Sequence, residues 1–149
     1  MTQHDDIGTS TDLVRYRIQA ARGDLRAARI LFKEEEYRAA NNRAYYAIFR
    51  VINAVHALDG KAYKRHRDAI ANFNKNYIKP EIFPRKIGRE IAEAEEIRHA
   101  SDYDDFYIAT KEEAAEQIKV ASELIDLLET YCENRIRKDS REMKSQPGE

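Results

Sequence analysis

Apolar residues recur every three or four positions along five stretches of the chain, the spacing that places them on one face of an α-helix. The stretches cover residues 10–35, 37–58, 65–77, 84–100 and 110–132. The connections between them are short, and no stretch shows the two-residue alternation that is typical of a β-strand. The pattern therefore predicts an all-α fold, an up-and-down bundle of four to five helices.

Polar segments flank this periodic region. Residues 1–9 carry no apolar stripe and predict a flexible N-terminal tail, so that the helical bundle covers residues 10–132. From residue 133 onward, charges of both signs are interleaved. This composition predicts a charged C-terminal tail, 133–149, that frays.

The second stretch has two faces that lack the charges expected on an outer helix. One face is an ordinary core stripe of Ala40, Ala44, Ile48, Val51, Val55 and Leu58. The opposite face carries aromatic, amide and imidazole groups: Asn42, Tyr46, Phe49, Asn53 and His56. We therefore expect this helix to be covered on both sides, either by a second subunit or by a neighbouring helix of the same chain.

The fourth stretch places an arginine where its apolar stripe needs another apolar side chain. Ile87, Ile91 and Ala94 share one stripe, and Arg98 occupies the next position on it. Because a guanidinium keeps its charge, an inward-facing Arg98 needs a carboxylate, a carbonyl or a ligand phosphate beside it. Two interpretations stay open: an ion pair with an acid of the loop 102–105, or a binding site that Arg98 lines.

Charge and composition narrow the classes of function. The 26 Lys and Arg nearly balance the 27 Asp and Glu, so net charge does not indicate a nucleic-acid-binding protein. A basic stripe on the first helix is a solvated face paired with carboxylates, a phosphate-binding strip or a docking face for an acidic partner: Arg15, Arg22, Arg26, Arg29 and Lys33. One Cys and four scattered His give no zinc-ligand spacing, and we expect no metal or cofactor. The absence of a leader and of a long apolar run predicts a cytoplasmic protein with no membrane segment.

Short motifs across residues 10–130 resemble the HEPN domain family. Three features are similar to the small stand-alone prokaryotic, toxin-like branch of this family. They are the run Asn42-Arg43-Ala44-Tyr45-Tyr46-Ala47-Ile48-Phe49, a helix that opens with His66, and Arg98 followed by Asp102-Tyr103-Asp104-Asp105. The resemblance implies a four- to five-helix bundle that forms a homodimer. In many members it implies a metal-independent endoribonuclease that acts on RNA as a toxin, beside a nucleotidyltransferase antitoxin.

The resemblance assigns the arginine of the family's catalytic motif to Arg98, whereas the histidine that follows it in the family is missing here. With four intervening residues the motif reaches Tyr103. The resemblance therefore implies Arg98 as the group that holds the phosphate, with Tyr103 and His66 as candidates for proton transfer. A tyrosine, with its ordinary pKa near 10, can donate a proton but is a poor base at neutral pH. Secondary candidates are His99, Asp102, Asn42 and Tyr46.

The resemblance also implies a tyrosine that the antitoxin nucleotidylates, for which Tyr103 and Tyr107 are candidates by position. Two functions stay open. One is an RNA-cleaving toxin whose groove lies at a homodimer interface. The other is a catalytically silent module for partner or nucleotide binding, in which Arg98 and the acidic loop form an ion-pair lock.

Overall fold

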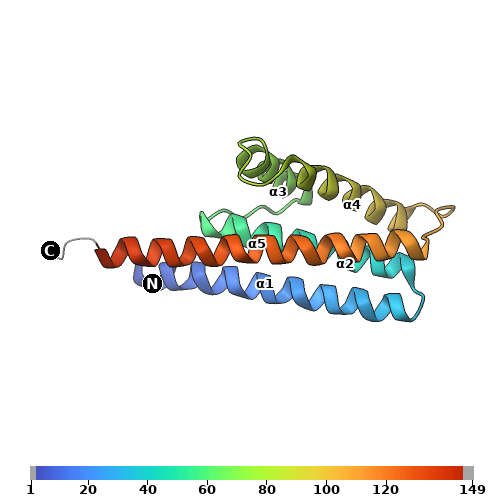
Figure 1. Ribbon diagram of the computed structural model, residues 1–149, viewed down its shortest axis with the longest axis horizontal. Coiled ribbons are helices and arrows are strands. Elements are labelled where there is room, and N and C mark those ends of the chain that lie inside the picture. Colours follow the sequence, from blue (N-terminus) through green and yellow to red (C-terminus); the bar gives the residue numbers. More distant parts are fainter. Residues whose placement is uncertain (1–2, 146–149) are drawn as a thin grey trace.

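The computed structural model describes residues 3–145, and Figure 1 shows its elements in chain order. The α-helices are α1 (Gln3–Lys33), α2 (Tyr37–Leu58), α3 (His66–Phe73), α4 (Arg85–Tyr103) and α5 (Lys111–Ser145). A π-helical turn, η1 (Asn74–Ile78), continues α3. No strand occurs within these residues. The predicted all-α fold is confirmed.

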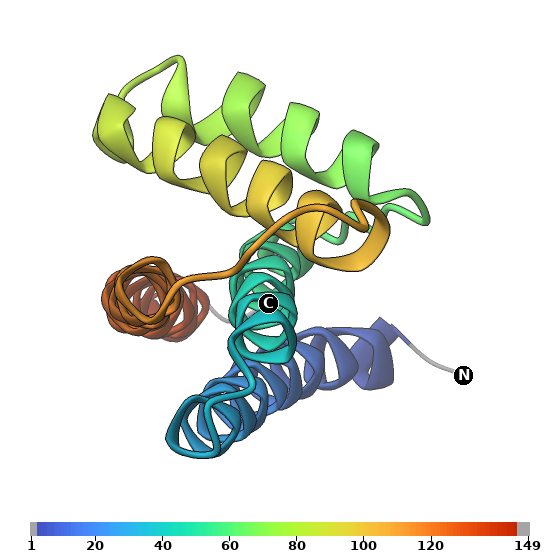
Figure 2. The same cartoon turned by 90° about the vertical axis from the view of Figure 1, so that its right-hand side faces the viewer.

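Helix α2 forms the centre of the bundle (Figure 2), with α1 and α5 along two of its sides and the α3–α4 hairpin across a third. The long helices alternate in direction along the chain (Figure 1), as an up-and-down bundle requires. The central position of α2 explains why neither of its faces is charged.

The core lies where α1, α4 and α5 meet α2. Its largest fully buried side chains include Ile18, Ile48, Ile91 and Leu124, and the buried stripe predicted for α2 is confirmed through Val55. The opposite face of α2 is covered in part by the same chain. His56 is buried, and its Nε2 donates to the backbone oxygen of Ala69 at 2.8 Å. At His56, therefore, the neighbouring helix α3 of the same chain covers this face of α2.

The helix boundaries toward the two ends of the chain differ from those predicted. Helix α1 begins at Gln3, because a helix that is already formed extends at little cost per residue. Helix α5 continues past residue 132 to Ser145, and the prediction of a tail from 133 missed its contacts. Ile136 packs on the core, and Arg135 donates to Asp59 at 2.9 Å. These contacts link α5 to the end of α2.

The basic stripe of α1 faces the acids of α5. Arg15 pairs with Glu133 at 3.2 Å, and Arg22 pairs with Asp126 at 3.1 Å and with Glu129. For these two arginines the interpretation as a solvated face paired with carboxylates is confirmed. Within residues 3–145, no helix has a stretch long and apolar enough to cross a bilayer.

Candidate functional site

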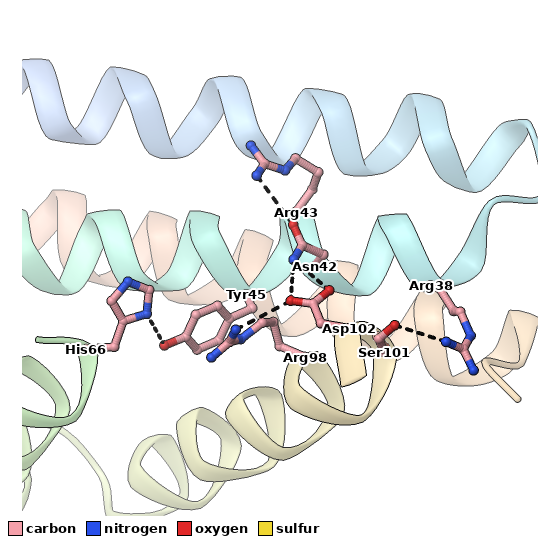
Figure 3. Close-up of polar contacts among 8 residues, drawn as sticks. All are labelled: Arg38, Asn42, Arg43, Tyr45, His66, Arg98, Ser101 and Asp102. Atoms are coloured by element: carbon pink, nitrogen blue, oxygen red, sulfur yellow. Dashed lines mark hydrogen bonds and ion pairs between the residues drawn. The ribbon is translucent and has the colours of Figure 1, made fainter. Parts of the chain in front are cut away.

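The Arg98 side chain lies in the seam between α4 and α2 (Figure 3). Its guanidinium carbon is 5.0 Å from the centroid of the Tyr45 ring, and its Nη1 donates to Asp102 Oδ2 at 3.4 Å. The side chain is 16% exposed, and its Nε is buried without a hydrogen-bond partner in the described part of the chain. The ring contact and the ion pair hold Arg98 in place. Because a guanidinium has five N–H donors, most of its donors make no hydrogen bond to the described residues.

Asp102 connects Arg98 to the two neighbouring helices. Its two oxygens accept hydrogen bonds from Asn42 Nδ2 at 3.0 and 3.1 Å. Asn42 Oδ1 accepts from Arg43 Nη2 at 3.3 Å, and Arg43 Nη1 pairs with the buried Asp24 of α1 at 3.0 Å. The ion pair that the sequence left open for Arg98 is therefore present, and a polar chain runs from α4 through α2 to α1.

His66, the first residue of α3, packs into an aromatic cluster on α2. Its Nδ1 is 3.0 Å from the Tyr45 hydroxyl, its ring stacks on Phe49 with centroids 3.8 Å apart, and Tyr46 meets it edge-on at 5.6 Å. Burial lowers the pKa of His66, and the positive charge of Arg98 lowers it further. Burial also raises the pKa of the Tyr45 hydroxyl. At neutral pH a neutral imidazole and a protonated phenol therefore face each other, with Arg98 on the same phenol ring.

Tyr103 lies on another side of α4. Its side chain is 68% exposed, and its ring centroid is 4.9 Å from that of His99, which is also exposed. Tyr103 follows Arg98 by five helical positions, roughly 140° around the axis. Within one chain the structure therefore groups Arg98 with His66, Asp102, Asn42 and Tyr46, and separates Tyr103 and His99 from them.

Arg38, near the start of α2, holds the loop that follows α4. Its guanidinium donates to the backbone oxygens of Ser101 at 3.2 Å, of Asp104 at 2.8 Å and of Tyr107. Its guanidinium carbon also lies 5.6 Å from the Tyr107 ring centroid. The Tyr107 hydroxyl is buried and has no hydrogen-bond partner among the described residues. Arg38 thus fixes the path of the loop. The two candidate tyrosines for modification differ, because the Tyr103 side chain is exposed and the Tyr107 hydroxyl is buried.

Sequence reasoning missed three residues of this region. Tyr45 lies inside the motif that carries the family resemblance, next to Tyr46, but only the packing of α4 on α2 shows that Arg98 contacts its ring. Asp24 is an acid beside the apolar stripe of α1, a signal that could have marked it as the buried partner of a cation. Arg38 gave no signal, because its partners are backbone carbonyls.

Besides a hollow of about 290 Å³ at Asn42, Arg43 and Asp102, two hollows in the described part of the chain adjoin the Arg98 cluster. One, of about 700 Å³, lies along the C-terminal half of α4 and is lined by Glu95, Glu96, Ile97, Arg98, His99, Ala100, Asp104 and Tyr107. The other, of about 270 Å³, lies between α1 and α2 and is lined by Arg17, Tyr46, Phe49, Arg50 and Asn53. Among the described residues, no group of three or more His, Cys, Asp or Glu side chains is arranged to hold a metal ion.

The model of the HEPN domain matches residues 14–131 of the chain. The chain belongs to the HEPN family. This HEPN protein is 27% identical to a protein of Thermotoga maritima named UPF0332 protein, over 84% of this chain and 95% of the relative. It is 33% identical to a protein of Methanocaldococcus jannaschii named as a proposed toxin, over 73% of this chain and 81% of the relative. A second such protein of that organism is 31% identical over 65% of this chain and 66% of the relative.

Proposed function

We propose that this HEPN protein is a toxin-like endoribonuclease that cleaves RNA without a metal in a groove formed by two copies of the chain. The names of the two Methanocaldococcus jannaschii relatives support a toxin-like role. The observation that carries the proposal is the position of Arg98, which lines a hollow, keeps unused donors and shares the Tyr45 ring with a neutral His66. An arginine that served only as a structural ion pair would not require this imidazole beside it.

The proposed reaction needs three groups. In strand cleavage the RNA 2′-oxygen attacks phosphorus and the 5′-oxygen leaves, so a base accepts the 2′-hydroxyl proton and an acid protonates the 5′-oxygen. Arg98 would bind the phosphate oxygens with its fork and stabilise the charge of the transition state. His66 Nδ1 is engaged with Tyr45, and its Nε2 has no partner among the described residues. A phenol oxygen can accept from Nδ1–H, which leaves a lone pair on Nε2, so the neutral imidazole can serve as the base through Nε2.

Tyr103 takes the second proton-transfer role in this proposal. Because it lies on the exposed side of α4, away from Arg98 of its own chain, its hydroxyl would act on RNA bound at the other copy. A groove that takes Arg98 from one chain and Tyr103 from the other would explain why the two residues point apart in one subunit.

Cleavage of RNA by the purified protein tests this proposal. A fluorescent mixed-sequence RNA is incubated with the wild type, Arg98→Ala, Arg98→Lys and the exposed control Arg26→Ala, in EDTA and in Mg²⁺. We expect cleavage in EDTA by the wild type and by Arg26→Ala, and a loss of at least about 100-fold in both Arg98 variants, since lysine lacks the bidentate fork. Equal rates for the wild type and Arg98→Ala would remove Arg98 from the mechanism.

We propose that a nucleotidyltransferase antitoxin neutralises the protein by modifying Tyr103. Of the two candidates, Tyr103 is 68% exposed, whereas the Tyr107 hydroxyl is buried. After incubation with the proposed nucleotidyltransferase antitoxin and ATP, mass spectrometry should find one or more nucleotidyl groups on Tyr103, and none in Tyr103→Phe. Modification at Tyr107 in the folded protein would contradict this assignment.

A second candidate function is a catalytically silent module for partner or nucleotide binding. The polar chain through Asp102, Asn42 and Arg43 favours it, because it ties Arg98 into the packing of three helices. In that case no RNA is cut in the assay above. Arg98→Ala would then lower stability while leaving every binding activity of the fold in place.

A further inference from the structure

One face of α2, beside α1, combines aromatic rings, a cation and an amide. Its residues follow at spacings of three, one and three along a single stripe of the helix: Tyr46, Phe49, Arg50 and Asn53. Together with Arg17 of α1 they line the hollow of about 270 Å³. The proposed reaction assigns no role to any of them.

The cations at this hollow outnumber the acids that pair with them. Arg50 and Arg43 both pair with Asp24, whose side chain is only 10% exposed. Arg17 donates from Nη1 to the backbone oxygen of Asn53 at 3.0 Å and makes no ion pair among the described residues. Burial lowers the pKa of the Arg17 guanidinium, which still stays charged at neutral pH. An anion in the hollow would supply the partner that Arg17 lacks.

The uncharged groups of the hollow suit a nucleobase. The rings of Tyr46 and Phe49 form part of its wall, and both residues are only partly buried. Asn53 Oδ1 is buried and has no hydrogen-bond partner among the described residues, so this oxygen lacks a donor. A carboxylate of an acidic peptide would satisfy Arg17 but not this oxygen. A nucleotide carries both a phosphate and a base with N–H donors and a π-face.

We propose that this hollow binds one nucleotide of an RNA strand, close to the nucleotide whose phosphate Arg98 would hold. The phosphate in the hollow lies between Arg17 and Arg50, and the base lies against Tyr46 with an N–H directed to Asn53 Oδ1. This subsite rests on the proposed function for its ligand, RNA. It holds and orients the strand within one chain and takes no part in breaking a bond.

His66 connects this hollow to the Arg98 site. The ring of Phe49, in the wall of the hollow, stacks on the His66 ring with centroids 3.8 Å apart, and Tyr46 meets the same imidazole edge-on. On its other side this imidazole reaches the Tyr45 hydroxyl, and Arg98 lies on the Tyr45 ring (Figure 3). A strand held at Arg98 therefore passes His66 before it reaches the hollow, which favours an RNA strand over a free mononucleotide as the ligand.

Binding of an RNA that cannot be cleaved tests this subsite separately from the proposed function. The probe is a fluorescein-labelled single strand of about six nucleotides with every 2′-hydroxyl methylated, because methylation removes the nucleophile. Arg17→Gln removes the cation that makes no ion pair, and Asn53→Asp keeps the shape of the side chain but places a carboxylate in the hollow. The controls Arg26→Gln and Asn134→Asp make the same charge changes at exposed positions of α1 and α5. Circular dichroism and thermal melts first establish that each variant is folded.

Fluorescence anisotropy then measures the dissociation constant of the probe at several salt concentrations. We expect Arg17→Gln and Asn53→Asp to bind at least about 10-fold more weakly than the wild type, and the controls to stay within about 2-fold of it. In Arg17→Gln the loss of one phosphate contact should reduce the slope of log affinity against log salt by about 0.7. Wild-type affinity in both hollow variants overturns the inference even if the protein cleaves RNA. Weaker binding in both, with no cleavage of unmethylated RNA, supports the subsite and contradicts the proposed function.

Photo-cross-linking locates the base. After irradiation, a probe that carries 5-iodouridine should attach to Tyr46 or Phe49, as mapped by mass spectrometry of the peptides, and the yield should fall in Asn53→Asp. Cross-links confined to other parts of the chain overturn the inference. An affinity for AMP equal to that for the strand overturns it as well, because a free mononucleotide would then be the ligand.

Discussion

The energy that holds Arg98 in its seam can be predicted from its contacts. In Arg98→Ala, the protein loses a cation–π contact at 5.0 Å and an ion pair at 3.4 Å to Asp102, whose side chain is 29% exposed. The first contact contributes about 0.5–2 kcal/mol and the second about 0.2–1 kcal/mol. The substitution also removes a buried Nε that has no partner among the described residues, which offsets part of the loss. We therefore expect the free energy of unfolding to fall by about 1–2 kcal/mol.

Urea unfolding of four proteins measures this prediction: the wild type, Arg98→Ala, Asp102→Ala and the double variant. The coupling energy of the cycle reports the ion pair alone, and we expect about 0.2–1 kcal/mol. At about 2–4 °C per kcal/mol for a chain of this size, the melting temperature of Arg98→Ala should fall by roughly 3–6 °C. The exposed control Arg26→Ala should stay within about 0.5 kcal/mol of the wild type.

Two results would refute this reasoning. A loss above about 4 kcal/mol in Arg98→Ala would mean that Arg98 is a structural support, as in a buried pair broken on one side. Missing cleavage in that variant could then not be assigned to chemistry. A loss below about 0.3 kcal/mol, with no coupling to Asp102, would mean that the seam contacts do not form in solution. Arg98→Lys, which keeps the charge and most of the packing, separates the fork from the charge.

Three further predictions concern buried groups. Burial lowers the pKa of His56, so that as pH falls this residue is protonated in the unfolded chain before it is protonated in the folded protein. The contribution of His56 to stability should therefore be full above about pH 6.5 and decrease below it. Denaturation at pH 7.5 and at pH 5.5 should show a smaller loss of stability for His56→Gln than for the wild type. Burial and a neighbouring glutamate raise the pKa of Glu113, whose Oε1 is buried and, like Asn41 Oδ1, has no hydrogen-bond partner among the described residues. Glu113→Gln supplies a donor and should stabilise the protein by about 0.5–1.5 kcal/mol at pH 7 in thermal melts; a lower melting temperature would contradict this. Burial raises the pKa of Cys132 to about 12, so a thiol reagent at pH 8 should react at least about 100-fold more slowly with the native protein than with the urea-unfolded chain.

The spacing of apolar residues was sufficient to predict the helices that build the bundle. Each helix buries one stripe, and the second uncharged face of α2, which we expected to be covered, is covered by α3 at His56 and stays half-buried at Tyr46 and Phe49. The ends of α1 and α5 were predicted less well. The polar positions there form helix because the packed part of each helix is already nucleated, and Arg135 finds its partner on another element. Such support is invisible in local composition.

The candidate site was predictable only in part, for a related reason. The apolar stripe of α4 showed that Arg98 points inward, and the next acidic loop showed that a carboxylate was available. The contact between the guanidinium and the Tyr45 ring depends on how α4 crosses α2. The spacing of residues within a single helix does not reveal this crossing. The separation of Tyr103 from Arg98 follows from α4 staying helical through residue 103, where the sequence suggested an earlier end.

The contacts of Arg98 explain how an arginine can replace an apolar residue on a buried stripe without large cost. Its stem packs along α4, the flat guanidinium lies on the Tyr45 ring, and Asp102 is itself held by Asn42. Because its neighbours are fixed by helix packing, little side-chain freedom remains to be lost when a ligand binds. A group held in this way is suited to bind charge as it develops, since the protein need not reorganise around it. The features that stabilise Arg98 in the fold are thus the features that a phosphate-binding role would require, and only variants that keep the charge but change its geometry can separate the two roles.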